Sequence, residues 1–330
     1  AKRLSTLVIF GLLVFVFLMA NNTSTWGLVF IILGLRFFGQ GMLGHISMVF
    51  CGKWFFKNKG KAVAVANSGY TLAEAIMPTI FVALIGLLSW QVSWYVSIIM
   101  SILILASVRF LAKTERNKGT KPQKENQQVG MLKKSWKRSE MLRSWVFWAA
   151  VPGLMTSPMI TTTLFFHQVH LVEIKSWDLS TYVLFIPAYS AATLFSLYLI
   201  GYLVDKLSTK IILPVFLFPL ISGLLLLSIA TSYLELLLIF ILLGLSAGAY
   251  IVVYGTFFPE FFGSLYLGSV RTVGVTIMVF SSAIGPVLSG YFIDLGYLID
   301  HQFKFFAAFS VFASLLFLTI NLSVKLPGKA

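Results

Sequence analysis

Apolar runs of about 20 residues recur along nearly the whole chain, and each has the length that an α-helix needs to cross the hydrocarbon core of a bilayer. Lipid offers no partners to backbone N–H and C=O groups, so only helices and closed barrels can span it. Barrel strands alternate polar and apolar residues over about ten positions, and these runs do not alternate. The sequence therefore predicts an all-α polytopic membrane protein embedded in a lipid bilayer. The expected spans lie at roughly 4–20, 26–50, 62–88, 92–112, 144–168, 180–203, 211–231, 235–258, 267–293 and 303–324.

The charges of the chain indicate how it is oriented. Of its 330 residues only 11% are charged, whereas a soluble domain has about a quarter. With residue 1 in the cytoplasm, only Lys175 and Lys304 among the basic loop residues lie outside. An excess of Lys and Arg in cytoplasmic loops is typical of membrane proteins. It predicts a multi-pass protein of the plasma (inner) membrane with a cytoplasmic C-terminus, and it explains the net charge of +14 without nucleic acid.

Patterns for metal binding and for catalysis are missing from the sequence. The single Cys51 excludes an internal disulfide and a cysteine metal cluster. The four histidines (His45, His167, His170 and His301) form no HxxxH or HExxH pattern, and no nucleophile–base pattern is found. We therefore expect no metal, no cofactor and no enzymatic activity, and we expect a monomer.

A polar stretch at 113–143 divides the chain into four expected spans (1–112) and six (144–330). It is basic and is expected in the cytoplasm. Its second half, MLKKSWKRSEML (131–142), predicts a basic amphipathic helix on a membrane surface.

The two halves are related by an internal repeat. Gly60 and Pro78 are separated by the same interval as Gly268 and Pro286, and the offset between the two pairs places Lys210 over Lys2. Two spans precede the loop of Lys210 in the second half and none precedes Lys2. The arithmetic predicts six spans plus four, with two spans missing before residue 1.

The loop GYLVDKLSTK (201–210) resembles the motif G-x-x-x-D-[RK]-x-G-[RK]-[RK] of the major facilitator superfamily, from which it departs at Ser208, where Gly is usual, and at Ile211. The stretches GQGMLGHISMVFCGKWFFKNKGKAVAVANSGYTLAEAIMP (39–78) and GTFFPEFFGSLYLGSVRTVGVTIMVFSSAIGPVLSGYFIDLG (255–296) resemble bacterial members near the monocarboxylate and oxalate–formate branch. The resemblance covers the entire chain. It implies the major facilitator fold, with ten of twelve helices, the third to the twelfth, present.

Two ionisable residues lie deep in the first four spans. A charge in mid-membrane costs at least ~2.5–3.5 kcal/mol unless it is paired or solvated. Glu74 and Arg36 lie at depths of about 18 and 15 Å from opposite ends of their spans, so we expect them to pair beside a water-filled cavity. RFFGQG (36–41) also resembles, with one extra residue, the family motif R-x-x-Q-G, which is tied to proton handling in antiporters. A static ion pair that only joins two helices is the alternative. Further candidates on the same faces are Gln40, Asn67 and Tyr70.

In the second half, the run at 144–168 contains Pro152 and Pro158, and proline removes a backbone donor from a helix. Interrupted helices mark binding sites in transporters, so the nearby hydroxyls of Thr156 and Thr161 are candidates for substrate contacts.

Tyr250 and Tyr254, four residues apart, share a helix face that either lines a cavity or packs against a neighbour. His167 and Gln168 lie near the outer end of their span, where they form either a gate or an ordinary membrane surface.

The loop motif predicts an inner gate. Asp205 at a helix end can bind basic residues or the N-terminus of a facing helix, with Lys206 and Lys210 beside it. Arg271 is expected to pair with Glu260 or Asp205 at this gate, and a role in substrate binding is the alternative.

These residues predict a secondary transporter that works by alternating access and is coupled to a proton or ion gradient. Arg36 favours a small organic anion, such as a monocarboxylate, as the substrate. Two alternatives remain open: an exporter of drugs or lipophilic metabolites, and a remnant that does not transport.

Overall fold

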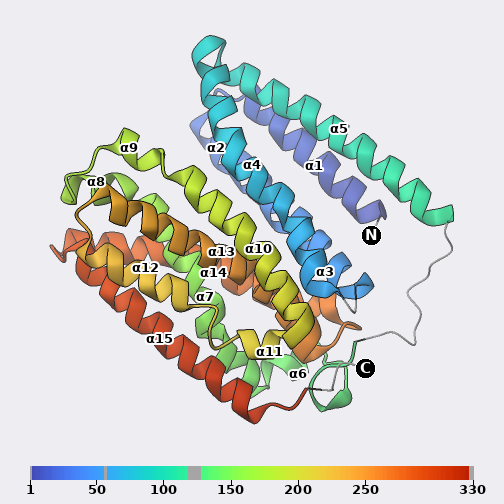
Figure 1. Ribbon diagram of the computed structural model, residues 1–330. Helices are drawn as coiled ribbons and strands as arrows, with labels where there is room; N and C mark the ends of the chain where they lie inside the picture. Colours follow the sequence, from blue (N-terminus) through green and yellow to red (C-terminus); the bar gives the residue numbers. More distant parts are fainter. Residues whose placement is uncertain (1, 56–57, 118–127, 327–330) are drawn as a thin grey trace. The chain divides into compact units, whose positions relative to one another are not determined.

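The computed structural model of the protein describes residues 2–55, 58–117 and 128–326 (Figure 1). Every regular element within these ranges is a helix, which confirms the all-α class. The first part of the chain forms α1 (Lys2–Ala20), α2 (Thr25–Leu35), η1 (Arg36–Leu43), α3 (Gly44–Trp54), α4 (Lys59–Leu87) and α5 (Trp90–Asn117). The second part forms η3 (Met131–Lys133), α6 (Arg138–Leu142), α7 (Trp145–Phe166), α8 (Gln168–Ile174), α9 (Leu179–Val183), α10 (Ile186–Leu207), α11 (Thr209–Ile212), α12 (Phe218–Ile229), α13 (Tyr233–Phe262), α14 (Leu267–Asp294) and α15 (Ile299–Ser323).

Seven helical segments of the described chain are long and apolar enough to cross a membrane: Thr25–Gly52, Trp90–Phe110, Trp145–Phe166, Thr181–Leu207, Tyr233–Phe262, Leu267–Asp294 and Ile299–Ser323. Two shorter apolar helices, Leu4–Ala20 and Phe218–Ile229, coincide with further expected spans. The count of ten spans stays a prediction.

The contacts group the chain into two units. One contains Ala1–Phe50 and Ala73–Asn126, and the other contains Cys51–Leu72 and Gln127–Ala330. The division therefore does not follow the order of the chain, because the segment Cys51–Leu72 packs with the C-terminal helices. The predicted bundles at 1–112 and 144–330 follow the order of the chain, and they stay a prediction.

In the first unit, α1 packs against α5, α2 and η1. Phe38 occupies the space in which a side chain at Gly11 would lie, and Phe15 does the same at Gly34. Small residues at such crossings let membrane helices approach closely. The segment η1 is a π-helix that joins α2 to α3 without a break, and π-helical turns are rare and frequent at functional sites.

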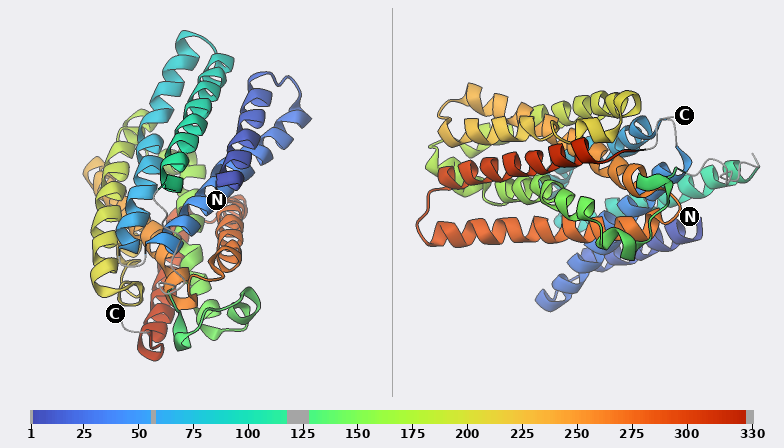
Figure 2. Two further views of the ribbon diagram at one scale, coloured as in Figure 1. Left: turned by 90° about the vertical axis from the view of Figure 1, so that its right-hand side faces the viewer. Right: turned by 90° about the horizontal axis from the view of Figure 1, so that it is seen from below.

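In the second unit, α7 packs against α14 and α15, α10 packs against α13, and α12 packs against α13 and α15. The red helix α15 beside the green α7 can be followed in Figure 2. Pro158 inside α7 cannot donate a hydrogen bond to the carbonyl of Leu154 one turn earlier. The hydroxyl of Tyr250 on α13 donates to this carbonyl instead, at 2.9 Å. The carbonyl that proline leaves without a partner in α7 thus accepts a hydrogen bond from a neighbouring helix.

The amphipathic helix predicted at 131–142 is wrong. The segment forms the short helices η3 and α6 with an extended stretch between them, and Leu132 and Lys133 have positive φ angles. Its backbone forms a hydrogen bond with the end of α13, because the N–H of Trp136 donates to the carbonyl of Phe262 at 2.8 Å. The side chains of Met131 and Met141 are buried in the same unit. Met131 and Met141 therefore pack inside the protein and not on a membrane surface.

Candidate functional site

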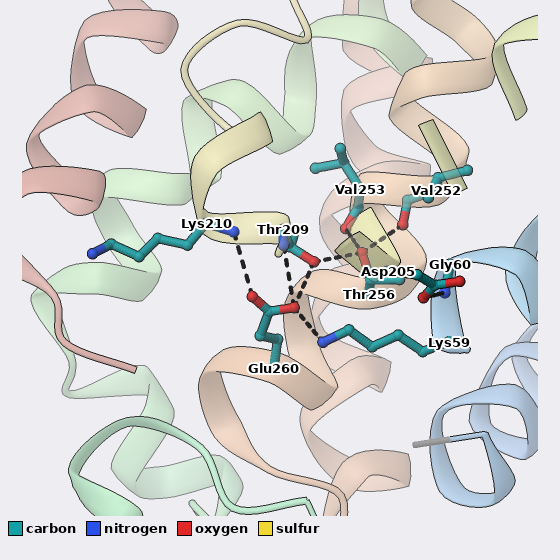
Figure 3. Close-up of polar contacts among 9 residues, drawn as sticks. All are labelled: Lys59, Gly60, Asp205, Thr209, Lys210, Val252, Val253, Thr256 and Glu260. Carbon is teal, nitrogen blue, oxygen red and sulfur yellow. Dashed lines mark hydrogen bonds and ion pairs between the residues drawn. The ribbon is translucent and has the colours of Figure 1, made fainter. Parts of the chain in front are cut away.

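A buried ion pair lies at the C-terminal end of α13. The carboxylate of Glu260 binds the ammonium group of Lys59, the first residue of α4 (Figure 3). Glu260 is 5% exposed and Lys59 is 4% exposed. Removing two charges from water costs several kcal/mol for each ion, so such a pair persists only when its geometry is good and further hydrogen bonds support it.

The start of α11 supplies these hydrogen bonds. The backbone N–H and the hydroxyl of Thr209 donate to Glu260 Oε2 at 3.2 and 2.9 Å, and the N–H of Lys210 donates to Oε1 at 3.4 Å. The Thr209 hydroxyl also lies 2.8 Å from the hydroxyl of Thr256. Figure 3 shows Lys59 and Thr209 converging on one oxygen, while the side chain of Lys210 extends away from it. Glu260 therefore joins the starts of two helices to the end of a third.

A second carboxylate, that of Asp205 near the end of α10, binds the same end of α4. It accepts hydrogen bonds from the backbone N–H groups of Gly60 at 2.7 Å and of Lys61 at 2.9 Å. The first N–H groups of a helix have no partner within the helix, and the positive end of the helix dipole favours an anion there. Asp205 thus caps α4 from a neighbouring helix.

Glycines allow the backbones to meet at this point. The Cα of Gly60 lies against the carbonyl of Gly201 on α10, and a Cβ at Gly201 would lie 2.9 Å from the carbonyl oxygen of Gly60. A Cβ at Gly255 on α13 would lie 3.5 Å from the Cβ of Val63. The first turns of α4 are therefore held by side-chain charges and by close backbone contact together.

The link between α10 and α11 passes through Ser208, whose φ is 107° and ψ 154°. This region of backbone conformation is populated almost only by glycine. The departure of the loop motif at this position, from Gly to Ser, therefore falls on a residue whose backbone conformation calls for glycine.

The predicted gate residues are placed as follows. Asp205 and Glu260 both lie at the site, but Glu260 is bound by Lys59, which the sequence analysis treated only as part of a basic loop. Arg271 does not pair with either carboxylate: its guanidinium carbon lies 5.1 Å from the ring centre of Tyr254. Lys206 lies over the ring of Tyr202 at 5.8 Å, and Lys210 contributes its backbone. The sequence could have pointed to Lys59 because it directly precedes Gly60, the glycine at which the internal repeat begins.

The predicted pair in the first unit is not formed. No ion pair joins Arg36 to Glu74 among the residues that the structure describes, and both side chains are exposed, as is that of Gln40. Arg36 is the first residue of η1, and the i to i+5 hydrogen bonds of a π-helix shift the faces that regular α-helical spacing assumes.

The two further candidates on α4 differ in their surroundings. The side-chain amide of Asn67 donates to the carbonyl of Val63 at 2.7 Å, and Tyr70 is exposed.

Two of the candidate residues in the second unit donate hydrogen bonds to backbone carbonyls of that unit. The hydroxyl of Thr156 donates to Gly153 O at 2.8 Å, and that of Tyr250 is used by Leu154. Thr161 lines a small, mostly apolar pocket together with Tyr182 and Tyr189.

The two outer-gate candidates lie at the break between α7 and α8. The ring Nε2 of His167 lies 3.0 Å from the carbonyl oxygen of Pro286 on α14, and Gln168 begins α8.

Comparison with known proteins identifies the family. The model of the Major Facilitator Superfamily matches residues 2–270. The chain belongs to the major facilitator superfamily. Among curated proteins, none matches the sequence at a significant level.

Solved structures share the fold of the chain. The fucose:proton symporter FucP of E. coli is 11% identical, with a TM-score of 0.69 over 96% of this chain and 83% of its own. The human organic anion transporter MFSD10 (TETRAN) is also 11% identical, with a TM-score of 0.71 over 97% of this chain and 76% of its own. Members of this superfamily are transporters and not enzymes, so the chain is a transporter of the superfamily.

Proposed function

We propose that the protein is a secondary transporter that works by alternating access, and that Lys59, Asp205 and Glu260 form its inner gate. The observation that carries this proposal is the buried ion pair between the start of α4 and the end of α13. When two surfaces separate, water can hydrate the charged groups that bound each other, whereas a purely apolar contact loses its hydrophobic stabilisation. A charged contact between helix ends is therefore suited to a surface that opens and closes repeatedly.

The side of the membrane follows from the surrounding charges. Lys59, Lys61, Lys206 and Lys210 all lie at or beside this contact, and cytoplasmic loops carry the excess of basic residues. We assign the contact to the cytoplasmic face of the plasma membrane, with the C-terminus also inside. On this proposal, the ion pair between Lys59 and Glu260 corresponds to the closed state of the gate.

We propose a small organic anion, such as a monocarboxylate, as the substrate. Support comes from the resemblance of 39–78 and 255–296 to the monocarboxylate and oxalate–formate branch. MFSD10, which shares the fold, is an organic anion transporter. Arg36, exposed on η1, is the substrate contact that we assign in the first unit.

We propose coupling to a proton gradient through Glu74. This residue is the carboxylate that lies deepest in an expected span, and a carboxylate in that setting can bind and release a proton. FucP, which shares the fold, is a proton symporter. We expect a monomer to be the functional unit.

Uptake into proteoliposomes tests the proposal. Purified protein is reconstituted with lactate, acetate, formate or oxalate outside, with and without an inward proton gradient, and with neutral acetamide as the matched control. We expect one or more carboxylates to accumulate with the gradient, acetamide to be excluded, and Glu74→Gln to abolish the response to the gradient. Transport of lipophilic cations in place of all four anions would support the exporter hypothesis instead.

A further inference from the structure

Arg271 on α14 is a buried cation whose charge the inner gate does not use. The residue is 4% exposed, and its Nε and Nη1 atoms have no hydrogen-bond partner among the described residues. It also forms no ion pair within the described part of the chain. The carboxylate of Glu260, which lies on the helix packed beside it, is already bound by Lys59 and Thr209.

A buried charge without a counter-charge is costly in a protein and in a membrane. The ring of Tyr254 offsets part of this cost, because the face of an aromatic ring attracts a cation. The ring accepts no conventional hydrogen bond, so the guanidinium donors remain available to an acceptor.

A second polar group lies at the same place. The hydroxyl of Tyr254 is buried and has no partner among the described residues, whereas the hydroxyl of the stacked Tyr250 donates to Leu154. The Tyr254 hydroxyl lies 3.1 Å from the position that a Cβ on Gly274 would take. Gly274 is one turn from Arg271 on α14, and the Arg271 guanidinium carbon lies 5.1 Å from the centre of the Tyr254 ring, so the hydroxyl and the guanidinium lie close together where α13 packs against α14.

We propose that Arg271 and Tyr254 form a binding site for a single carboxylate group directly behind the inner gate. A guanidinium and a phenol together offer several donors and one positive charge, which a carboxylate matches in charge and geometry. Tyr254 and Glu260 are six positions apart on α13, about 9 Å at the rise of a helix. The assignment rests on the proposed function, and it makes this site the last position of the organic anion before release to the cytoplasm.

Binding to the purified full chain in detergent tests the site without transport. Sodium acetate and sodium lactate are the probes, and sodium chloride at equal ionic strength and acetamide are the controls. We expect the two carboxylates to raise the Tm by a few degrees, because a ligand that binds only the folded state stabilises it. Neither control should match this shift.

Three variants locate the effect. Arg271→Met should reduce carboxylate affinity by ~100-fold or more, since charge and donors are lost together. Tyr254→Phe keeps the aromatic ring and should reduce it about five- to tenfold, which corresponds to one hydrogen bond. Arg143→Gln removes an exposed arginine of the same unit and should leave the affinity unchanged.

A purely structural Arg271 predicts different results. If the guanidinium only anchors α14 to α13, Arg271→Met lowers the Tm without ligand and carboxylates act equally on Tyr254→Phe and on the wild type. If the site binds an anion, the ligand-free Tm of Arg271→Met stays level or rises. An equal carboxylate shift in all variants, or no greater shift than with chloride, overturns the proposal. Because binding is measured without uptake, a failure of transport in proteoliposomes leaves this result standing, and the reverse also holds.

Discussion

Glu260→Gln is the substitution that tests the proposed inner gate. It removes the negative charge and leaves the ammonium group of Lys59 buried without its counter-charge. Removing one partner of a buried ion pair costs about 3–5 kcal/mol. The glutamine oxygen can still accept from Thr209, so we take the lower end, about 3 kcal/mol, which corresponds to roughly a 100-fold shift toward the open gate.

The thiol of Cys51 reports this shift. It is the sole cysteine in the sequence, and it is buried with its Sγ 3.7 Å from Ala62 O. The next residue, Gly52, packs against Leu267 and Pro259 at the ends of α14 and α13, so separation of these helix ends uncovers the thiol. We expect maleimide to label Cys51 about 100-fold faster in Glu260→Gln than in the wild type, until labelling of the open form limits the rate.

The pair Lys134–Glu140 provides the matched control. Its atoms are 3.4 Å apart, and its side chains are 45% and 41% exposed. Exposed pairs are worth about 0–1 kcal/mol, so Glu140→Gln should change the labelling rate by less than about fivefold. Circular dichroism checks that both variants stay folded. A labelling rate in Glu260→Gln equal to that of the wild type would refute the gate role of this ion pair.

Three further substitutions test the local geometry. Gly60→Ala should destabilise the protein by about 1–3 kcal/mol, seen as a lower Tm, because its methyl group would meet the carbonyl of Gly201. As the control, the methyl group of Gly69→Ala would meet nothing within 4 Å, so this variant should be neutral or slightly stabilising. Equal effects of the two substitutions on Tm would contradict the close crossing of α4 and α10. Ser208→Gly should raise the Tm by relieving a backbone strain of about 1–3 kcal/mol, and an unchanged or lower Tm would count against that strain. Tyr250→Phe should cost about 0.5–1.5 kcal/mol by leaving Leu154 O without its donor, whereas no change in Tm would show that Tyr250 only packs.

The helical class and the carboxylates of the gate could be predicted from the sequence. Long apolar runs that do not alternate with polar residues can only be helices in lipid. The loop motif placed Asp205 at a helix end, where it does cap α4. Glu260 was expected at the gate as a partner of Arg271, whereas the structure pairs it with Lys59. Both lysine and arginine can satisfy a buried carboxylate, so charge alone could not distinguish Lys59 from Arg271.

Other features depend on tertiary contacts that local patterns do not contain. The segment 131–142 has the charge pattern of a surface helix, yet Trp136 and Met131 pack against the end of α13, and this packing overrides helical propensity. Tyr250 and Tyr254 look equivalent by spacing. Only the proline-released carbonyl of Leu154 and the charge of Arg271 give them different surroundings.

A reversible crosslink across the gate tests most directly that the gate must open during transport. A Cβ at Gly255 would lie 3.5 Å from that of Val63, within the range of a disulfide, so Val63→Cys with Gly255→Cys in a Cys51→Ser background can join α4 to α13. Gly223→Cys with Leu242→Cys, whose Cβ separation would be 3.4 Å, joins α12 to α13 and is the matched control. In proteoliposomes, we predict that oxidation of the gate pair stops carboxylate uptake, that reduction restores it, and that the control pair transports in both states. Undiminished uptake with the gate disulfide fully formed would contradict the account.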